Sequence, residues 1–220
     1  LLVHEPRPLR AHNPEPVIPK RVNYASETGR LLLTDVYAGR NMQGVARGEI
    51  KRLLVLECLP KPINYTGGMD PLTYGGSFSL ERVLGTVPVE DDGSAYLELP
   101  AGRAVFFVAL DAKGDSVKRM QSFCSVMPGE NTSCLGCHEN RATSGMNRTG
   151  SPPAAAARPP SAVEPVPGMP DVFDFPRDIQ PILDKHCVRC HDYDAHPGAP
   201  EGPRAGHAIL TGDHGPMYSH

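Results

Sequence analysis

Two features are missing from this chain of 220 residues: long apolar runs and an excess of basic charge. The longest apolar runs, near Leu53–Leu56 and Val105–Leu110, are far shorter than the roughly 20 residues that a membrane-spanning helix needs. A net charge of −3, with the two signs interspersed, leaves no basic face for nucleic acid. We therefore expect neither a membrane span nor nucleic-acid binding.

Familiar catalytic arrangements are missing too. No paired carboxylates and no Ser-His-Asp arrangement stand out, and the single acidic residues are typical of a solvated surface. The chain begins at Leu1 without a signal-like segment and stops at His220 inside a module that looks unfinished. We expect it to be a fragment of a longer protein.

Cysteine, in contrast, follows a clear pattern. The chain contains two C-x-x-C-H runs, a first run at Cys134–His138 and a second run at Cys187–His191. In such a run both thiols can bond to the vinyl groups of a haem, and the adjoining histidine becomes an axial ligand of the iron. The sequence thus predicts two covalently bound c-type haems. The attachment sites are Cys134, Cys137, Cys187 and Cys190, and the iron ligands are His138 and His191.

Zinc is the alternative for the same residues, because four cysteines in two pairs can close one tetrahedral site. Zinc modules usually place the second pair roughly 15–20 residues after the first. Here 49 residues, including a proline-rich stretch, separate Cys137 from Cys187. A four-cysteine site also has no use for a histidine directly after each pair, so the spacing favours haem.

The 24 prolines and 22 glycines point to turns, edges and linkers rather than to long helices. Strands are predicted at residues 29–37, 51–59, 86–90, 94–99, 105–110 and 117–126, with a turn at Asp91–Gly93. Both faces of Val105–Leu110 are apolar, which is typical of a central strand. These short strands predict a mainly β, sandwich-like domain with the first run at its edge.

Four segments are predicted along the chain. Residues 1–24 are a proline-rich linker from an upstream domain, and 25–141 are a β-rich haem-binding domain. Residues 142–170 are a semi-rigid spacer rich in proline and alanine, and 171–220 are a truncated α-helical cytochrome c-like module. In this module Asp178 is expected to cap a helix whose apolar face, Ile179, Ile182 and Leu183, leads into Cys187. Few apolar residues follow this helix, so we expect the module to depend on the bound haem for a stable fold.

The second axial ligand of the haem on the second run stays open. His186 is too close to the attachment site and is expected either to lie on the surface or to support an iron ligand without binding the iron. The other candidates within the chain lie in irregular sequence: His196, His207, His214, Met217 and His220. The alternative is a ligand beyond residue 220. Near the first haem, the paired glycines of the Gly67–Gly76 loop would let backbone approach a flat ligand, with Tyr65, Met69 and Tyr74 nearby; a plain surface loop is the alternative.

Several stretches resemble the middle domain of the hydrazine synthase alpha subunit family. They are Arg52–Glu57, Lys61–Tyr65, the Gly67–Gly76 loop, Val87–Ala95, Lys118–Phe123 and Cys134–Glu139. The stretch Asp174–Leu183, together with the second run, resembles the cytochrome c module that often follows this domain. The resemblance covers about residues 25–215 and implies a β-propeller upstream in the same chain.

The resemblance also bears on metal ligands. In the namesake enzyme a tyrosine four residues after the first motif histidine ligates the haem, and that histidine turns towards zinc. Ala142 stands at this position here, which argues against the same active site. The family suggests that Cys58, Cys124 or both join His138 in binding zinc; alternatively, the two cysteines are lone core residues or form a disulfide between strands.

Two functions are expected from these observations. The first is electron transfer by a dihaem cytochrome module, with a redox partner protein, in the periplasm or another extracytoplasmic compartment where haem is attached. The alternative is a haem redox enzyme related to the hydrazine synthase alpha subunit, with an open coordination position on the first haem. A zinc-bound interaction module remains only if no haem attaches. The sequence leans towards the electron carrier over the enzyme.

Overall fold

The computed structural model describes residues 14, 16–40, 42–59, 80–137, 151–194, 209–212, 214–215 and 218–219. Its strands are β1 (Thr28–Asp35), β2 (Arg52–Leu59), β3 (Leu80–Pro88), β4 (Ala95–Pro100), β5 (Val105–Leu110), β6 (Ser116–Arg119), β7 (Asn131–Gly136), β8 (His214–Gly215) and β9 (Tyr218–Ser219). The helical elements are a 3-10 turn η1 (Ala154–Ala157), a π-helical turn η2 (Phe175–Ile179) and the helix α1 (Gln180–His186).

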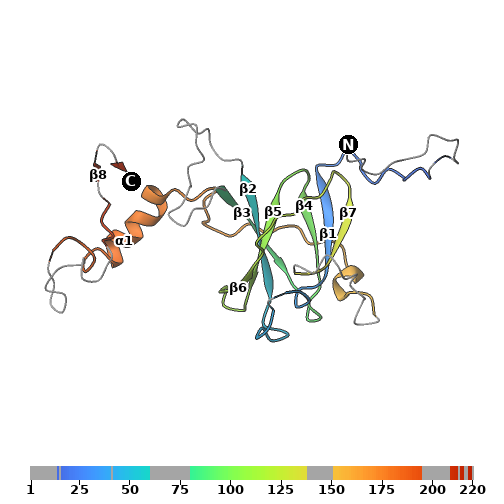
Figure 1. Ribbon diagram of the computed structural model, residues 1–220, viewed down its shortest axis with the longest axis horizontal. Coiled ribbons are helices and arrows are strands. Elements are labelled where there is room, and N and C mark those ends of the chain that lie inside the picture. The colour runs from blue at the N-terminus through green and yellow to red at the C-terminus, as the bar shows by residue number, and fades with distance from the viewer. Residues whose placement is uncertain are drawn as a thin grey trace, which may run out of the picture.

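Two sheets pack face to face around one core (Figure 1). The first has three strands in the order β4-β1-β7, and the second has four in the order β3-β2-β5-β6. Neighbouring strands are antiparallel except β1 and β7, which run parallel. Alternate residues of both sheets fill the core, among them Leu31, Leu53, Val55, Leu97, Leu99 and Val105. The prediction of a mainly β domain is confirmed.

The central position predicted for Val105–Leu110 is confirmed, because β5 lies between β2 and β6. The predicted turn at Asp91–Gly93 is present as well. Asp92 Oδ1 accepts hydrogen bonds from the Ser94 N–H and hydroxyl at 3.0 and 2.6 Å, and Gly93 takes the positive φ of 87° that favours glycine. This turn carries the chain from one sheet to the other, since β3 and β4 belong to different sheets.

The strand predictions differ from the structure at β3 and after β5. A strand was predicted only over residues 86–90, but β3 begins at Leu80, because residues 80–83 pair with residues 56–59 of β2. The strand predicted at 117–126 is shorter, because β6 ends at Arg119 and the following residues form only a single bridge, between Cys124 and Val105. A strand that was not predicted, β7, follows at Asn131–Gly136 and pairs with β1. Its first residues are polar, and its side chains are alternately exposed and half-buried, as an edge strand requires.

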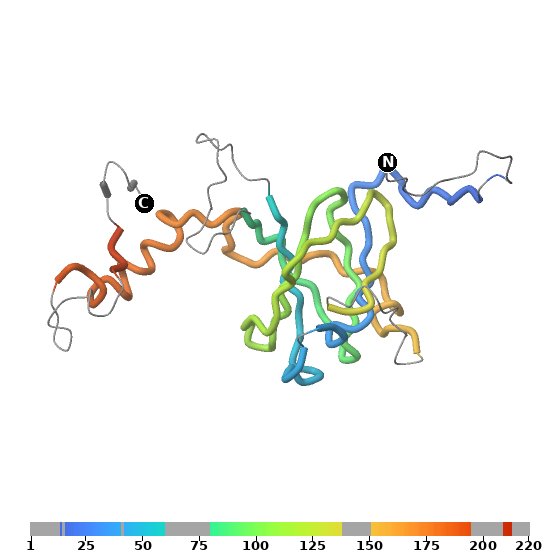
Figure 2. The backbone as a smooth tube through the Cα atoms, viewed as in Figure 1, coloured from blue at the N-terminus to red at the C-terminus, as the bar shows by residue number. Residues whose placement is uncertain are grey.

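Residues 151–164, here called the strap segment, lie on the sandwich (Figure 2). Ala154 and Ala155 donate N–H bonds to Asp92 Oδ2 and Ser94 Oγ at 2.7 and 3.0 Å. Further along, Glu164 exchanges two backbone hydrogen bonds with Thr86 of β3 at 2.8 and 2.9 Å. The spacer predicted at 142–170 is therefore bound to the sandwich over this segment, because its extended backbone satisfies polar groups along β3 and β4.

Asp92 is one side-chain anchor of the strap segment, beside the ion pair of Arg158 with Glu90, and its replacement by alanine is expected to loosen the segment at Ala154. Burial alone would raise the pKa of Asp92, but the hydrogen bonds from Ala154 and Ser94 outweigh it and lower that pKa. Hydrogen bonds to charged groups contribute about 1.5–3 kcal/mol, so D92A should lower the free energy of unfolding by an amount in that range. Urea unfolding measures this loss, and limited proteolysis should show new cleavage near Ala154.

The matched control for this variant is D91A, because Asp91 is the exposed neighbour of Asp92. It should leave both the unfolding midpoint and the cleavage pattern unchanged. Equal effects of D91A and D92A would contradict the anchoring role.

The helix predicted before the second run is confirmed, but its cap lies earlier than expected. Asp174, not Asp178, is the N-cap: its Oδ1 accepts the Arg177 N–H at 2.9 Å. Asp178 acts from inside the helical segment, where its Oδ2 accepts the Asp174 N–H at 2.8 Å. The start moves back because η2 precedes α1 and adds a turn. In the described part of the chain, no helix is long and apolar enough to cross a membrane.

The Asp178 carboxyl group is expected to titrate below the ordinary pKa of an aspartate. The Arg177 guanidinium donates to both of its carboxylate oxygens at 2.9 and 2.7 Å, and together with the Asp174 N–H these bonds lower the pKa of Asp178 to about 2. A lowered pKa stabilises the folded segment above about pH 4, and this contribution disappears as the pH falls towards 2. Carbon-detected NMR titration of the Asp178 carboxyl group should give a midpoint near 2.

The Asp178 midpoint should rise in R177Q, which removes the charged donor. The exposed Arg189 supplies the control, because R189Q should leave that midpoint in place. An Asp178 midpoint near its ordinary value in the unmodified protein would contradict the ion pair.

Candidate functional site

A cavity of about 360 Å³ lies between the two sheets, where the edge strands β6 and β7 face each other. Its walls are mainly apolar, and its volume falls within the range of roughly 300–1,000 Å³ that is usual for ligand pockets. The apolar lining comes from both sheets: Leu31, Leu33, Val36, Leu53, Leu97, Phe107 and Ala109. The structure therefore leaves a space for an apolar group at one edge of the sandwich.

The thiols of the first run line this cavity. Cys134 lies in β7 opposite Leu33 of β1, and Cys137 follows the end of the strand. The Cys137 N–H donates to the Ala38 carbonyl at 2.6 Å, which fixes the end of the run against the segment after β1. The run thus lies at the edge of the sandwich, as predicted. His138 lies outside the described residues.

Two glycines allow the first run to lie so close to the segment after β1. A Cβ atom added to Gly136 would be 2.1 Å from the Ala38 carbonyl oxygen, and one added to Gly39 would be 2.0 Å from the Cys137 carbonyl oxygen. Gly39 also has a φ of 151°. Both positions therefore require glycine, and Gly136 is one of the two residues between the cysteines of the run.

Cys124 is the third cysteine at the cavity. Its backbone N–H and carbonyl pair with those of Val105 at 2.8 Å each. Burial, with Cys134 nearby, raises the pKa of Cys124 to about 11, and burial also raises the pKa of Cys137 although Lys118 acts in the opposite direction. Cys124 and Cys137 are therefore thiols rather than thiolates at neutral pH.

Cys58 lies elsewhere. It pairs with Glu81 of β3, and its electrostatic neighbours are Glu81, Arg119 and Glu57. Arg119 forms an ion pair with Glu81 and lies 4.8 Å above the centre of the Phe106 ring, on the face of β5 opposite to Val105. The structure therefore places Cys58 and Cys124 on opposite faces of the four-stranded sheet.

This separation bears on the zinc and disulfide hypotheses. None of the six cysteines forms a disulfide in this structure, so the disulfide suggested between Cys58 and Cys124 is not present. Among the residues that the structure describes, no group of three His, Cys, Asp or Glu side chains could hold a metal ion. Since His138 is outside those residues, the zinc hypothesis stays a prediction.

The second run is a tight turn that continues α1. The Cys187 N–H donates to the Leu183 carbonyl at 2.8 Å, and the His191 N–H donates to the Cys187 and Val188 carbonyls at 3.0 Å each. Residues 209–212 return to this turn: the Leu210 N–H donates to the His191 carbonyl at 2.9 Å. The buried Gln180 then holds the Leu210 carbonyl through its Nε2 at 2.9 Å. Cys187, Cys190 and His191 are thus brought within one turn.

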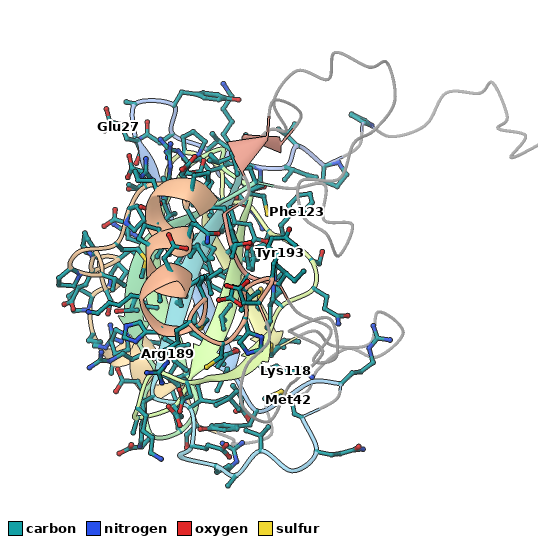
Figure 3. All side chains as sticks on the ribbon, turned by 90° about the vertical axis from the view of Figure 1, so that its left-hand side faces the viewer. Glu27, Met42, Lys118, Phe123, Arg189 and Tyr193 are labelled. Carbon is teal, nitrogen blue, oxygen red and sulfur yellow. The ribbon has the colours of Figure 1, made fainter. Side chains whose placement is uncertain are left out.

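Large apolar side chains around the second run are unusually exposed. Phe173, Phe175, Ile182 and Tyr193 are 48%, 50%, 56% and 54% exposed. Figure 3 shows Arg189 and Tyr193 beside α1. Ile182 belongs to the apolar face predicted for this helix, whose other members, Ile179 and Leu183, are half-buried. Within the described residues this face is only partly covered.

The other candidates are distributed as follows. His186 is exposed in the last turn of α1, as expected, and His214 lies in β8. The remaining candidates lie outside the described residues: Tyr65, Met69, Tyr74, the rest of the Gly67–Gly76 loop, Ala142, His196, His207, Met217 and His220.

Two cavity residues were not singled out as ligands from the sequence. Lys118 of β6 and Met120 just after it both line the cavity. The two-residue spacing of Lys118 and Met120 indicates that their side chains share one face of a strand. That this face borders the cavity follows only from the position of β6 beside β5, where the Met120 N–H donates to the Phe107 carbonyl at 2.9 Å.

The fold and site together define a class of protein, a two-sheet β domain that carries a C-x-x-C-H run on an edge strand and is followed by a short helix with a second run. Residues 48–139 match the family model of the hydrazine synthase alpha subunit middle domain. The predicted resemblance to this domain is confirmed over those residues, which include the first run and end before the second.

A solved structure of Kuenenia stuttgartiensis hydrazine synthase is similar to this chain, with a TM-score of 0.57 and 21% sequence identity. The similarity covers 77% of this chain and 30% of that one, so this chain spans less than a third of the length of its structural relative. At this identity the likeness shows the fold alone. No curated protein matches the chain.

Proposed function

We propose that this chain is a dihaem c-type cytochrome module that transfers electrons as part of a longer extracytoplasmic protein. The observation that carries the proposal is that both thiols of the first run line one apolar cavity between the sheets. Covalent haem attachment implies an extracytoplasmic compartment, and electron transfer implies a redox partner protein. A haem, when bound, supplies one-electron chemistry; the chain supplies attachment, burial and orientation.

The first site suits a haem because of what surrounds its two thiols. Cys134 and Cys137 lie along one edge of the cavity, and leucine, valine and phenylalanine side chains from both sheets form its walls. Such mainly apolar walls would favour a large apolar ring over a hydrated metal ion.

The second site suits a haem for a different reason. The helical module exposes about half of Phe173, Phe175, Ile182 and Tyr193, and burying such side chains contributes about 1.5–3 kcal/mol each. A module of this size needs a stabilising element besides its own core. A haem bonded to Cys187 and Cys190 would supply an apolar surface beside these residues.

The second candidate function is a haem redox enzyme with an open coordination position on the first haem. The match of residues 48–139 to the hydrazine synthase alpha subunit middle domain favours it, since that domain belongs to an enzyme by name. The two candidates share the haem and differ in whether a small molecule reaches its iron.

Maturation of the full chain with the cytochrome c assembly machinery, followed by intact mass measurement, tests the shared part of the proposal. The expected mass is that of the polypeptide plus two haems. Low-spin spectra from both reduced haems support electron transfer, whereas a high-spin component that shifts with carbon monoxide supports the enzyme. A properly matured sample with the mass of the bare polypeptide would refute both.

A further inference from the structure

We infer that Met120 is an iron ligand of the haem on the first run, in addition to the histidine that the run itself supplies. This inference rests on the proposed function, because it needs a haem bonded to Cys134 and Cys137. It goes further by assigning the second ligand of that iron. Ala142 stands where the family has its tyrosine ligand, and Tyr65, Met69 and Tyr74, which were expected near this haem, lie outside the described residues.

The position of Met120 is set by its backbone. Its N–H donates to the Phe107 carbonyl at 2.9 Å, so it continues the edge of the four-stranded sheet one residue beyond β6. Phe107 packs against the core, and Met120 and Phe107 both line the cavity. The cysteines of the first run come from β7, in the other sheet, so Met120 belongs to the opposite wall of the cavity.

Few of the described cavity residues carry an atom that can ligate iron. Besides the two attachment cysteines they are Ser133, Lys118, Cys124 and Met120. Ser133 precedes Cys134 on β7 and so belongs to the same wall as the attachment site. Lys118 would have to lose its proton, and it lies close enough to Cys137 to act on that thiol.

Cys124 and Met120 remain. Cys124 is held by its two backbone bonds to Val105, and its burial beside Cys134 keeps it a protonated thiol at neutral pH. Met120 needs no deprotonation, and its unbranched side chain has three rotatable bonds with which to reach across the cavity. Thioether is also an established haem ligand opposite histidine in c-type cytochromes.

The consequence concerns the choice between the two candidate functions. A thioether on the second axial position raises the reduction potential and closes the iron to small molecules, which favours electron transfer over catalysis at this haem. The family match alone would favour the open site.

The experiment uses the full chain matured with its haem and carrying Cys187→Ala and Cys190→Ala, so that only the first haem is present. In this parent we expect a low-spin haem with the near-infrared charge-transfer band of a thioether bonded to ferric iron. Met120→Leu, which nearly conserves volume, should abolish that band, lower the reduction potential and allow carbon monoxide to bind the ferrous form. Met120→His should restore a low-spin haem at a lower potential than the parent.

The control is Met127→Leu, because Met127 is 43% exposed and does not line the cavity; it should leave spectrum and potential unchanged. An unchanged spectrum in Met120→Leu would overturn the assignment. If Met120→Leu fails to retain haem, Met120→His decides: a low-spin haem supports the ligand role, and no haem overturns it. A parent that carries no haem refutes the proposed function instead.

Discussion

Replacement of Cys134 and Cys137 by alanine should remove one haem from the mature protein and leave the other in place. Both thiols line the cavity between the sheets, so the pair is expected to hold its haem independently of the helical module. The reciprocal variant, Cys187→Ala with Cys190→Ala, should remove the other haem. Intact mass should therefore fall from two haems to one in each double variant and to none when the two are combined.

The two losses should differ in their effect on folding. In the helical module, loss of the haem leaves the exposed apolar side chains around α1 without cover, so the signals of residues 171–194 should lose dispersion in NMR spectra. The sandwich has its own core of fully buried residues such as Val55, Leu97 and Leu99, so it should remain folded without the first haem. Comparison of the two double variants separates these effects.

The matched control is Cys58→Ala, which makes the same chemical change at a thiol on the opposite face of the four-stranded sheet. It should retain both haems, because Cys58 does not line the cavity. Two haems in the Cys134/Cys137 variant, or a haem lost from Cys58→Ala, would contradict the assignment of attachment sites.

Local patterns predicted most of the sandwich. Alternation and turn residues placed β1, β2, β4 and β5 to within about two residues, because each of these strands has one face in the core and a glycine- or proline-containing turn at its end. The two-sheet core follows from the same alternation. The positions of Cys134 and Cys137 at an edge could also be predicted, since the first run follows the last expected strand.

The features that were missed depend on contacts between residues far apart in the sequence. β7 is polar at its start and becomes a strand by pairing in parallel with β1, about 100 residues earlier. The strap segment has no apolar periodicity, and its backbone is held by side chains such as Asp92 and Ser94. Neither partner can be identified from the local sequence of these segments.

The same limitation applies to the candidate site. The alternation that puts Leu53 and Val55 into the core predicts that Cys58 faces away from it, but no pattern fixes Cys124, which lies outside the strands and is held by one bridge to Val105. The cavity itself exists because β6 and β7 are the edge strands that face each other. Met120 becomes a candidate ligand only in that arrangement.

Alanine in place of Gly136 should destabilise the sandwich and lower haem attachment at the first run, although residues between the two cysteines of such a run are ordinarily spacers. A Cβ at this position would lie 2.1 Å from the Ala38 carbonyl oxygen, a backbone atom that cannot rotate away. The end of β7 and the segment after β1 would have to separate, which would weaken the bond from the Cys137 N–H to Ala38. Overpacking of this kind costs about 1–3 kcal/mol, and we expect a loss of unfolding free energy near 3 kcal/mol.

The second run provides the control, because Arg189 occupies the position that corresponds to Gly136 and is exposed. R189A should change the free energy of unfolding by less than about 0.5 kcal/mol and leave haem on the second run intact. Urea unfolding together with haem counting by mass distinguishes the two sites. If G136A proved as harmless as R189A, the first run would not be held against the segment after β1, and the cavity would lose the edge that fixes its thiols.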